Sequence, residues 1–219
     1  MKKCLEGVKA VIFDLDGTLI DTEKIYRKAW PVAMESIGYV FTDEQYLQMR
    51  SLGRPFSANK FIEWYGDDTV YDRARKIRNE IFKKHIDANG ISKKKGAIEL
   101  LTFLREKGII TAIATATDIE RATKYIKMAG LDGYFDKVLS ATMVDEGKPS
   151  PKVYQFACRE LSLKPEDCVA VEDAPNGIRS AFGAGLRVIM VPDQSEADEE
   201  LMEMVYSRED DLSKIIDLF

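Results

Sequence analysis

Four short runs of apolar, largely β-branched residues constrain the fold of this 219-residue chain more than any other feature. The runs cover residues 8–13, 109–114, 168–171 and 187–191, and their continuous hydrophobicity is typical of buried strands. Segments with helical spacing of apolar residues lie between them, over 97–107, 119–129 and 151–161. Strands that alternate with helices predict an α/β fold in which helices cover both faces of a parallel sheet.

The stretch from residue 21 to residue 94 differs from the rest of the chain. It contains no run typical of a strand, its apolar residues recur at helical spacing, and turn-forming residues such as Gly38 and Gly66 divide it into several helices. We therefore predict a Rossmann-like α/β core of residues 1–20 and 95–219. A mainly α-helical cap of residues 21–94 is inserted after the first strand.

Charge and composition exclude several classes of protein. The net charge of −5 argues against a nucleic-acid-binding surface, which needs an excess of lysine and arginine. No apolar stretch approaches the roughly 20 residues of a membrane span, so we expect a cytoplasmic protein that is a monomer by default. With His85 as the sole histidine and three cysteines without a paired spacing, a zinc site or a cysteine phosphatase is not expected.

Reactive or coordinating side chains follow three of the predicted strands. The first strand ends at Asp14 and Asp16, the second at Thr115, and the third at Glu172 and Asp173. Ligands bind outside the carboxyl ends of strands in an open parallel sheet, so these side chains meet in one site if the strands are neighbours.

Four carboxylates in a partly buried site require a cation. Asp14, Asp16, Glu172 and Asp173 are hard oxygen ligands, which suit Mg²⁺ that retains water and binds a phosphate. Lys148, between Gly147 and Pro149, supplies a second positive charge. A metal, a lysine, a hydroxyl and carboxylates together indicate a phosphoryl-transfer site.

In such a site, Asp14 would attack phosphorus to form an aspartyl-phosphate, and Asp16 would act as general acid and base. Mg²⁺ and Lys148 would neutralise the phosphoryl oxygens in the transition state. The structural alternative for Asp14 and Asp16 is a turn and helix cap after a strand. Their combination with the other groups favours catalysis.

Four motifs, in order along the chain, resemble those of the haloacid dehalogenase superfamily. They are Asp14-Leu15-Asp16-Gly17-Thr18-Leu19, Thr115 after a strand, Gly147-Lys148-Pro149-Ser150-Pro151, and Val171-Glu172-Asp173 followed by Gly177 and Ala184-Gly185. The helical insertion resembles the cap of the phosphatase and β-phosphoglucomutase branch. The resemblance implies that Asp14 is nucleophile and metal ligand, and that Asp16 is acid/base and binds the metal through its carbonyl. Asp173 completes the protein ligands, and Glu172 binds directly or through water.

The resemblance also implies a phosphate site and a substrate class. Thr115, the backbone at Ala116 and Lys148 would hold the phosphate. Independently of the resemblance, Tyr26, Arg50 and Arg54 are candidates for recognising the leaving group from the cap, and exposed helix and loop residues are the structural alternative. The dehalogenase and phosphonate-cleaving branches lack an aspartate corresponding to Asp16, so its presence favours phosphate esters. We expect a magnesium-dependent phosphatase that acts on a small phosphorylated metabolite, with a sugar phosphate as first candidate.

Two alternatives stay open from sequence. A β-phosphoglucomutase typically has a histidine where this chain has Tyr26, and a Ser-Arg pair where it has Gly53-Arg54-Pro55-Phe56, and both differences weaken the mutase interpretation. A signalling receiver domain also uses Mg²⁺, a lysine and an aspartyl-phosphate. Such domains lack a long insertion after the first strand and the spacing of Asp14, Asp16 and Thr18, and a phospho-accepting module would show no turnover.

Overall fold

The protein, a computed structural model in which residues 4–219 are described, contains a six-stranded parallel sheet. Its strand order is β3-β2-β1-β4-β5-β6, which puts β1 between β2 and β4. The strands are β1 Ala10–Phe13, β2 Ile110–Thr115, β3 Lys137–Ser140, β4 Cys168–Glu172, β5 Arg187–Met190 and β6 Ser207–Arg208. The prediction of a parallel α/β fold is confirmed.

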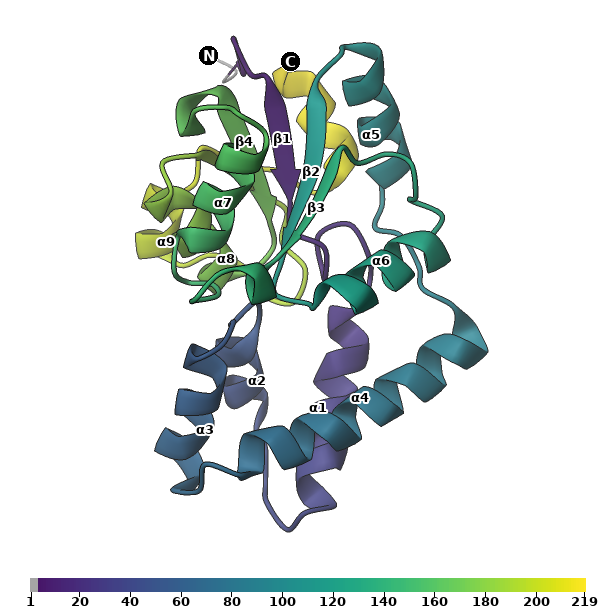
Figure 1. Ribbon diagram of the computed structural model, residues 1–219, viewed down its shortest axis with the longest axis vertical. Coiled ribbons are helices and arrows are strands. Elements are labelled where there is room, and N and C mark those ends of the chain that lie inside the picture. Colours follow the sequence, from purple (N-terminus) through teal and green to yellow (C-terminus); the bar gives the residue numbers. More distant parts are fainter. Residues whose placement is uncertain (1–3) are drawn as a thin grey trace.

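Helices connect the strands and form a separate group beside the sheet (Figure 1). This group contains α1 Glu23–Glu35, α2 Asp43–Met49, α3 Phe56–Tyr65 and α4 Val70–Asn89. Around the sheet lie α5 Ala97–Glu106, α6 Ile119–Met128, α7 Lys152–Glu160, α8 Pro175–Gly183 and α9 Glu199–Glu203, with 3-10 turns at Ala141–Met143, Pro165–Asp167 and Leu212–Leu218. Within residues 4–219, no helix is long and apolar enough to cross a membrane.

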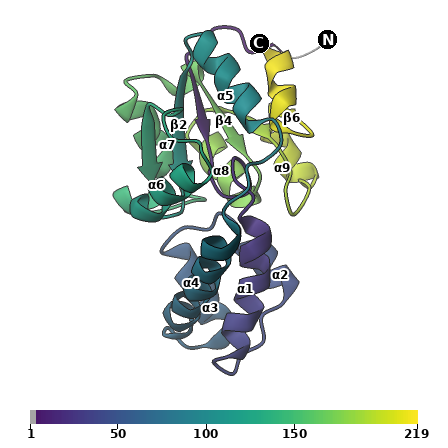
Figure 2. The same cartoon turned by 90° about the vertical axis from the view of Figure 1, so that its right-hand side faces the viewer.

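Successive side chains of each strand point to opposite faces of the sheet, and a hydrophobic core forms on each face. Val11 and Phe13 of β1 pack on the face covered by α5, α6 and the C-terminal 3-10 turn. Ala10 and Ile12 pack on the opposite face, against α7 and α8. Figure 2 shows α5 and the C-terminal segment together on one side of the sheet. Helices on both faces leave the carboxyl-terminal edge of the sheet as the place where a ligand can enter.

Two adjacent segments join α1–α4 to the sheet. Ile20 forms a β-bridge with Lys93, the amide of Asp21 donates to the carbonyl of Ser92 at 2.9 Å, and that of Lys94 donates to Leu19 at 2.9 Å. The outgoing and returning chains are therefore hydrogen-bonded to each other next to β1. This paired connection holds the four helices over the carboxyl ends of the strands (Figures 1 and 2).

Candidate active site

The central strands bring the predicted acidic residues together. Asp14 directly follows β1, and its amide donates to the carbonyl of Val171 in β4 at 2.9 Å. Glu172 is the last residue of β4, and Asp173 follows it. Oxygens of Asp14, Glu172 and Asp173 lie within 4.8 Å of one another, and all three residues are buried. The strand order thus produces the acidic cluster that the sequence predicted.

Lys148 lies inside this cluster. Its fully buried Nζ is 2.5 Å from Asp14 Oδ1 and 2.6 Å from Glu172 Oε1. Burial alone would lower the pKa of Lys148, but the two carboxylates outweigh burial and hold that pKa above its ordinary value. Tyr154 of α7 donates from its hydroxyl to Glu172 Oε1 at 2.7 Å. Lys148 is therefore a permanent cation fixed against Asp14.

The cluster still carries excess negative charge. Lys148 pairs with Asp14 and Glu172, and Arg50 pairs with Asp173, while the neighbouring Asp16 pairs with no cation within residues 4–219. Four carboxylates against two cations leave the charge that one divalent cation would balance. Burial raises the pKa of Asp14 well above its usual range despite Lys148, and raises that of Asp173 to about 6. Glu172 Oε2 is buried and lacks a hydrogen-bond partner in the described chain. These oxygen donors fit a hard divalent cation such as Mg²⁺.

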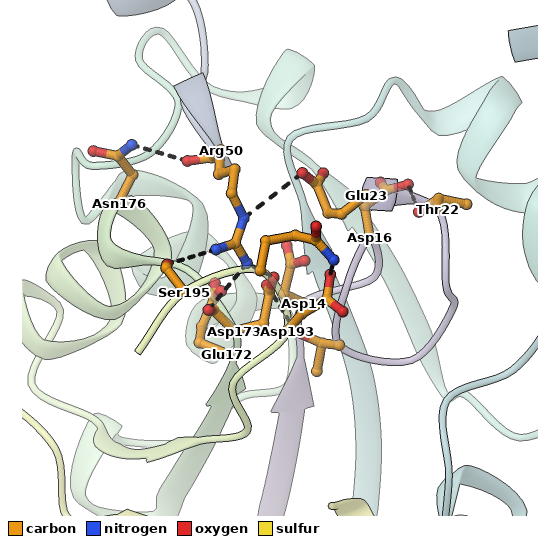
Figure 3. A network of polar contacts seen from close by, with 12 residues as sticks. Asp14, Asp16, Thr22, Glu23, Arg50, Glu172, Asp173, Asn176, Asp193 and Ser195 are labelled. Carbon is orange, nitrogen blue, oxygen red and sulfur yellow. Dashed lines mark hydrogen bonds and ion pairs between the residues drawn. The ribbon is translucent and has the colours of Figure 1, made fainter. Parts of the chain in front are cut away.

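The second cation of the cluster is Arg50, which comes from the end of α2 (Figure 3). Its fully buried guanidinium donates to the carboxylate of Asp173, to the carbonyl of Asp173 at 3.2 Å and to Ser195 Oγ at 2.8 Å. Sequence analysis named Arg50 only as a candidate for recognising the leaving group, and no local pattern predicts its burial against Asp173. A residue of the helical group therefore contacts the fully buried carboxylate of Asp173 in the core.

Glu23, at the start of α1, is a functional candidate that sequence analysis did not identify. Tyr46 donates from its hydroxyl to the Glu23 carboxylate, and Arg50 Nε lies 3.8 Å from Glu23 Oε2. Burial, with a smaller contribution from Asp173, raises the pKa of Glu23 to about 8 against the influence of Arg50. Burial thus favours the protonated form of this carboxyl. An acidic residue in a first helical turn normally interacts with the helix dipole at the surface, so no local pattern marks Glu23 as buried.

Asp16 is oriented by two hydroxyl groups. Thr22 Oγ1 donates to Asp16 Oδ1 at 2.6 Å, and Thr117 Oγ1 donates to Asp16 Oδ2 at 2.7 Å. Thr115, the last residue of β2, accepts a hydrogen bond from the amide of Thr117 at 3.0 Å. Gly17 has a φ of 88°, and a Cβ there would collide with the Asp173 carboxylate, so a glycine is required beside Asp16.

A cavity of about 570 Å³ separates the sheet edge from α1–α4. Asp14, Asp16, Thr115 and Ala116 line its sheet side. Lys148, Glu172 and Asp173 are fully buried and lie outside its lining, next to Asp14. A substrate in this cavity would reach Asp14 and Asp16 directly, and the Nζ of Lys148 lies immediately behind Asp14.

Tyr26 and Arg54 also line the cavity but differ in their surroundings. Tyr26 is 5% exposed and stacks on Phe82 of α4 with ring centres 4.2 Å apart. The guanidinium of Arg54 pairs with Asp72, and its side chain is 55% exposed. Tyr26 is thus a fixed part of the cavity wall, whereas the charge of Arg54 already has a partner.

The loop after α2 is hydrogen-bonded to the loop that carries Lys148. The amide of Gly53 donates to the carbonyl of Lys148 at 2.8 Å, and the amide of Gly147 donates to the backbone carbonyl of Arg54 at 2.8 Å. A Cβ on Gly53 would lie 2.6 Å from Gly147 Cα, closer than real Cβ contacts. The position of Lys148 therefore depends on a backbone contact with the helical group.

Comparisons with known proteins are consistent with this geometry. The family described as haloacid dehalogenase-like hydrolase matches residues 8–185. The phosphorylated carbohydrates phosphatase of Thermotoga maritima is 31% identical over 185 residues, 83% of this chain and 84% of that protein. The β-phosphoglucomutase of Bacillus subtilis is 28% identical over 191 residues, 84% and 83% of the two chains. A mutant CbbY from Rhodobacter sphaeroides, solved in complex with xylulose-1,5-bisphosphate, has a TM-score of 0.79 and 27% identity, and the match covers 94% of this chain and 96% of that one.

Proposed function

The chain belongs to the haloacid dehalogenase-like hydrolases, and we propose that it is a magnesium-dependent phosphatase that hydrolyses a small phosphorylated sugar. The observation that carries the proposal is the position of Asp14, which lines the cavity and also lies 2.5 Å from the buried Nζ of Lys148. A carboxylate oriented by a fixed cation, with space for a substrate in front, suits nucleophilic attack on phosphorus.

In the first half-reaction, an oxygen of Asp14 attacks the phosphoryl group. The bond from phosphorus to the ester oxygen breaks, and Asp16 gives its proton to the departing alcohol. In the second half-reaction, Asp16 takes a proton from water, and the water oxygen displaces Asp14 from phosphorus. The hydroxyl groups of Thr22 and Thr117 support this assignment, because they hold Asp16 at the cavity wall.

Asp14, Asp173 and the backbone carbonyl of Asp16 would hold Mg²⁺, with Glu172 binding directly or through water. When bound, Mg²⁺ supplies positive charge that neutralises the phosphoryl oxygens. Thr115, the backbone at Ala116 and Lys148 would bind the same phosphate. The buried and unbalanced carboxylates support the metal assignment, and the cavity lining supports the placement of Thr115 and Ala116.

Residues 21–94 would act as a cap that closes over the bound substrate. Closure would exclude water and present the sugar to Asp16, and opening would release the products. Figure 1 shows α1–α4 over the carboxyl ends of the strands. The cavity lined by residues of both parts supports this role. Tyr26 and Arg54 would then contact the leaving group, Tyr26 as a fixed aromatic wall.

The relatives support a phosphorylated sugar as substrate. One is named a phosphorylated carbohydrates phosphatase, and the CbbY structure contains a sugar bisphosphate. A β-phosphoglucomutase activity is the second candidate, because a relative with that name covers a similar share of the chain. Tyr26 and the Gly53-Arg54-Pro55-Phe56 sequence favour the phosphatase, since mutases typically have a histidine and a Ser-Arg pair there.

The test is phosphate release from a panel of sugar phosphates, nucleotides and other small phosphomonoesters with Mg²⁺, beside conversion of β-glucose 1-phosphate to glucose 6-phosphate. Phosphate release that disappears with EDTA is the expected result. Conversion of the isomers with little phosphate released would instead identify a mutase. Phosphorylation of the protein without turnover of any ester would identify a phospho-accepting module.

A further inference from the structure

Three arginines gather on the wall of the cavity that the helices form. Arg75 and Arg78 lie on α4 and Arg121 lies on α6, and all three line the same cavity as Asp14. Asn79 Oδ1 accepts from Arg78 Nη2 at 2.7 Å and from Arg121 Nη1 at 3.1 Å. One amide oxygen therefore holds two guanidinium groups close together, although their charges repel.

These arginines are only partly neutralised by protein groups. Arg121 pairs with Asp118, but within residues 4–219 no carboxylate forms an ion pair with Arg75 or Arg78. Arg78 Nε is buried and has no hydrogen-bond partner in that part of the chain. Burial, followed by repulsion from Arg78 and Arg121, lowers the pKa of Arg75. Unpaired charges at a partly buried wall are costly, so the arrangement is expected to be stabilised by an anion.

Arg78 is held in a fixed position rather than mobile in solvent. Its guanidinium carbon lies 4.5 Å from the ring centre of Tyr26 and 4.8 Å from that of Trp30. Such cation–π contacts hold the planar group, and apart from the bond to Asn79 its N–H groups, Nε–H included, have no acceptor within residues 4–219. Tyr26 and Trp30 line the cavity too, so Arg78 projects over the same space that opens onto Asp14.

We infer that Arg75 and Arg78 bind a second anionic group of the substrate while its reacting phosphate lies at Asp14. This inference rests on the proposed phosphatase function and adds a substrate class, a small sugar derivative with a second phosphate or a carboxylate. Bidentate hydrogen bonds from guanidinium groups suit both anions. Arg54 differs from these two arginines, because it forms an ion pair with Asp72.

The test compares three substrates that differ in the second anion: glucose 6-phosphate, glucose 1,6-bisphosphate and 6-phosphogluconate. For the parent protein, kcat/KM is expected to be highest for a substrate with two anionic groups, and which of the two is preferred tells phosphate from carboxylate. For each variant, the kcat/KM of the preferred two-anion substrate is divided by the kcat/KM of glucose 6-phosphate. Arg78→Gln and Arg75→Gln should each lower this ratio by about tenfold or more, mainly because KM for the two-anion substrate rises. Arg73→Gln, on an exposed position of α4, is the matched control.

Arg78→Lys separates charge from geometry, and thermal melting of each variant checks that the helices stay folded. An unchanged ratio in folded Arg75→Gln and Arg78→Gln proteins would overturn the inference, and so would equal kcat/KM of the parent protein for all three substrates. Absence of phosphate release from every substrate would instead overturn the proposed function. The two failures are therefore distinguishable.

Discussion

Lys148 is a fully buried cation whose ammonium contacts Asp14 and Glu172. Replacing it by methionine leaves these two carboxylates without their counter-ion, and breaking a buried pair in this way costs about 3–5 kcal/mol. We expect Lys148→Met to lower the free energy of unfolding by about that amount in urea denaturation with EDTA. Lys152→Met, at a side chain that is 40% exposed, should change it by less than about 0.5 kcal/mol. Equal stabilities of the two variants would contradict the buried charge pair.

Glu23 makes stability depend on pH. Its pKa is 4.5 without the fold and about 8 within it, so between these values the folded protein keeps a proton that the unfolded chain has lost. Rising pH therefore favours unfolding in this window, by up to about 1.4 kcal/mol per pH unit from this group. Glu23→Gln should remove that slope in urea denaturation from pH 5 to 8, while Glu35→Gln, exposed on the same helix, should keep it. The same slope in Glu23→Gln and parent protein would refute the assignment.

At the residue scale, sequence predicted the groups that end strands but not those that reach the site from the helices. Asp14, Glu172 and Asp173 follow continuous apolar runs, so their common location follows from sheet geometry alone. Arg50 and Glu23 lie at helix ends, where a charge normally meets solvent or the helix dipole. Their burial depends on the packing of the helices against the core, which no local pattern encodes.

Two loops meet at glycines, and this contact links the helical group to Lys148. A methyl group at Gly53 would lie 2.6 Å from Gly147 Cα and 3.0 Å from the amide nitrogen of Lys148. Both are backbone atoms of the opposite loop, so the two loops would have to separate. Gly53→Ala should therefore lower stability by about 1–3 kcal/mol and also reduce kcat/KM. Thermal melting and kinetics measure both effects.

Gly183→Ala provides the matched control for this contact. A Cβ at Gly183 would lie 3.6 Å from Pro151 Cβ, an ordinary distance, and the residue is helical. Alanine should stabilise the helix there by up to about 1 kcal/mol and leave kcat/KM unchanged. If Gly53→Ala behaved like Gly183→Ala, the contact between the loops would not position Lys148.

Arg50 should compete with the metal, because both act on the carboxylate of Asp173. Arg50→Gln removes a charged donor and its repulsion of a cation, so Mg²⁺ affinity should rise by about tenfold or more. Isothermal titration of substrate-free protein with Mg²⁺ measures the change directly. Arg54→Gln, whose guanidinium pairs with Asp72, should leave the affinity unchanged. Weaker binding in Arg50→Gln would show that the arginine supports the metal site instead.

At the element scale, four strands were predicted within a few residues, but β3 and β6 were missed. β3, Lys137–Ser140, is half exposed at its start because it is an edge strand, so it lacks the continuous apolar run of β1 or β4. β6 consists of Ser207–Arg208, too short for any periodicity. Edge strands are defined by a neighbour's hydrogen bonds more than by their own composition.

The whole molecule places Asp14, the proposed nucleophile, in the core and a positively charged wall in the helical group on opposite sides of one cavity. Sequence predicted the α/β core and the chemistry at its edge, because both follow from strand order and motif position. The cavity needs both parts at once, so its arginines could not be selected from the many charged residues of helices α4 and α6. Under the proposed function, substrate choice would therefore depend on the assembled fold.

The central claim is that Asp14 carries the phosphoryl group during turnover. The most direct test is acid quench of the enzyme with Mg²⁺ and its best substrate, followed by mass spectrometry of the peptides. We predict one phosphoryl group on Asp14 in the parent protein, and neither phosphorylation nor phosphate release in a folded Asp14→Asn variant. Phosphate release by Asp14→Asn, or turnover of the parent protein with no phosphoryl group on Asp14 at any quench time, would contradict the account.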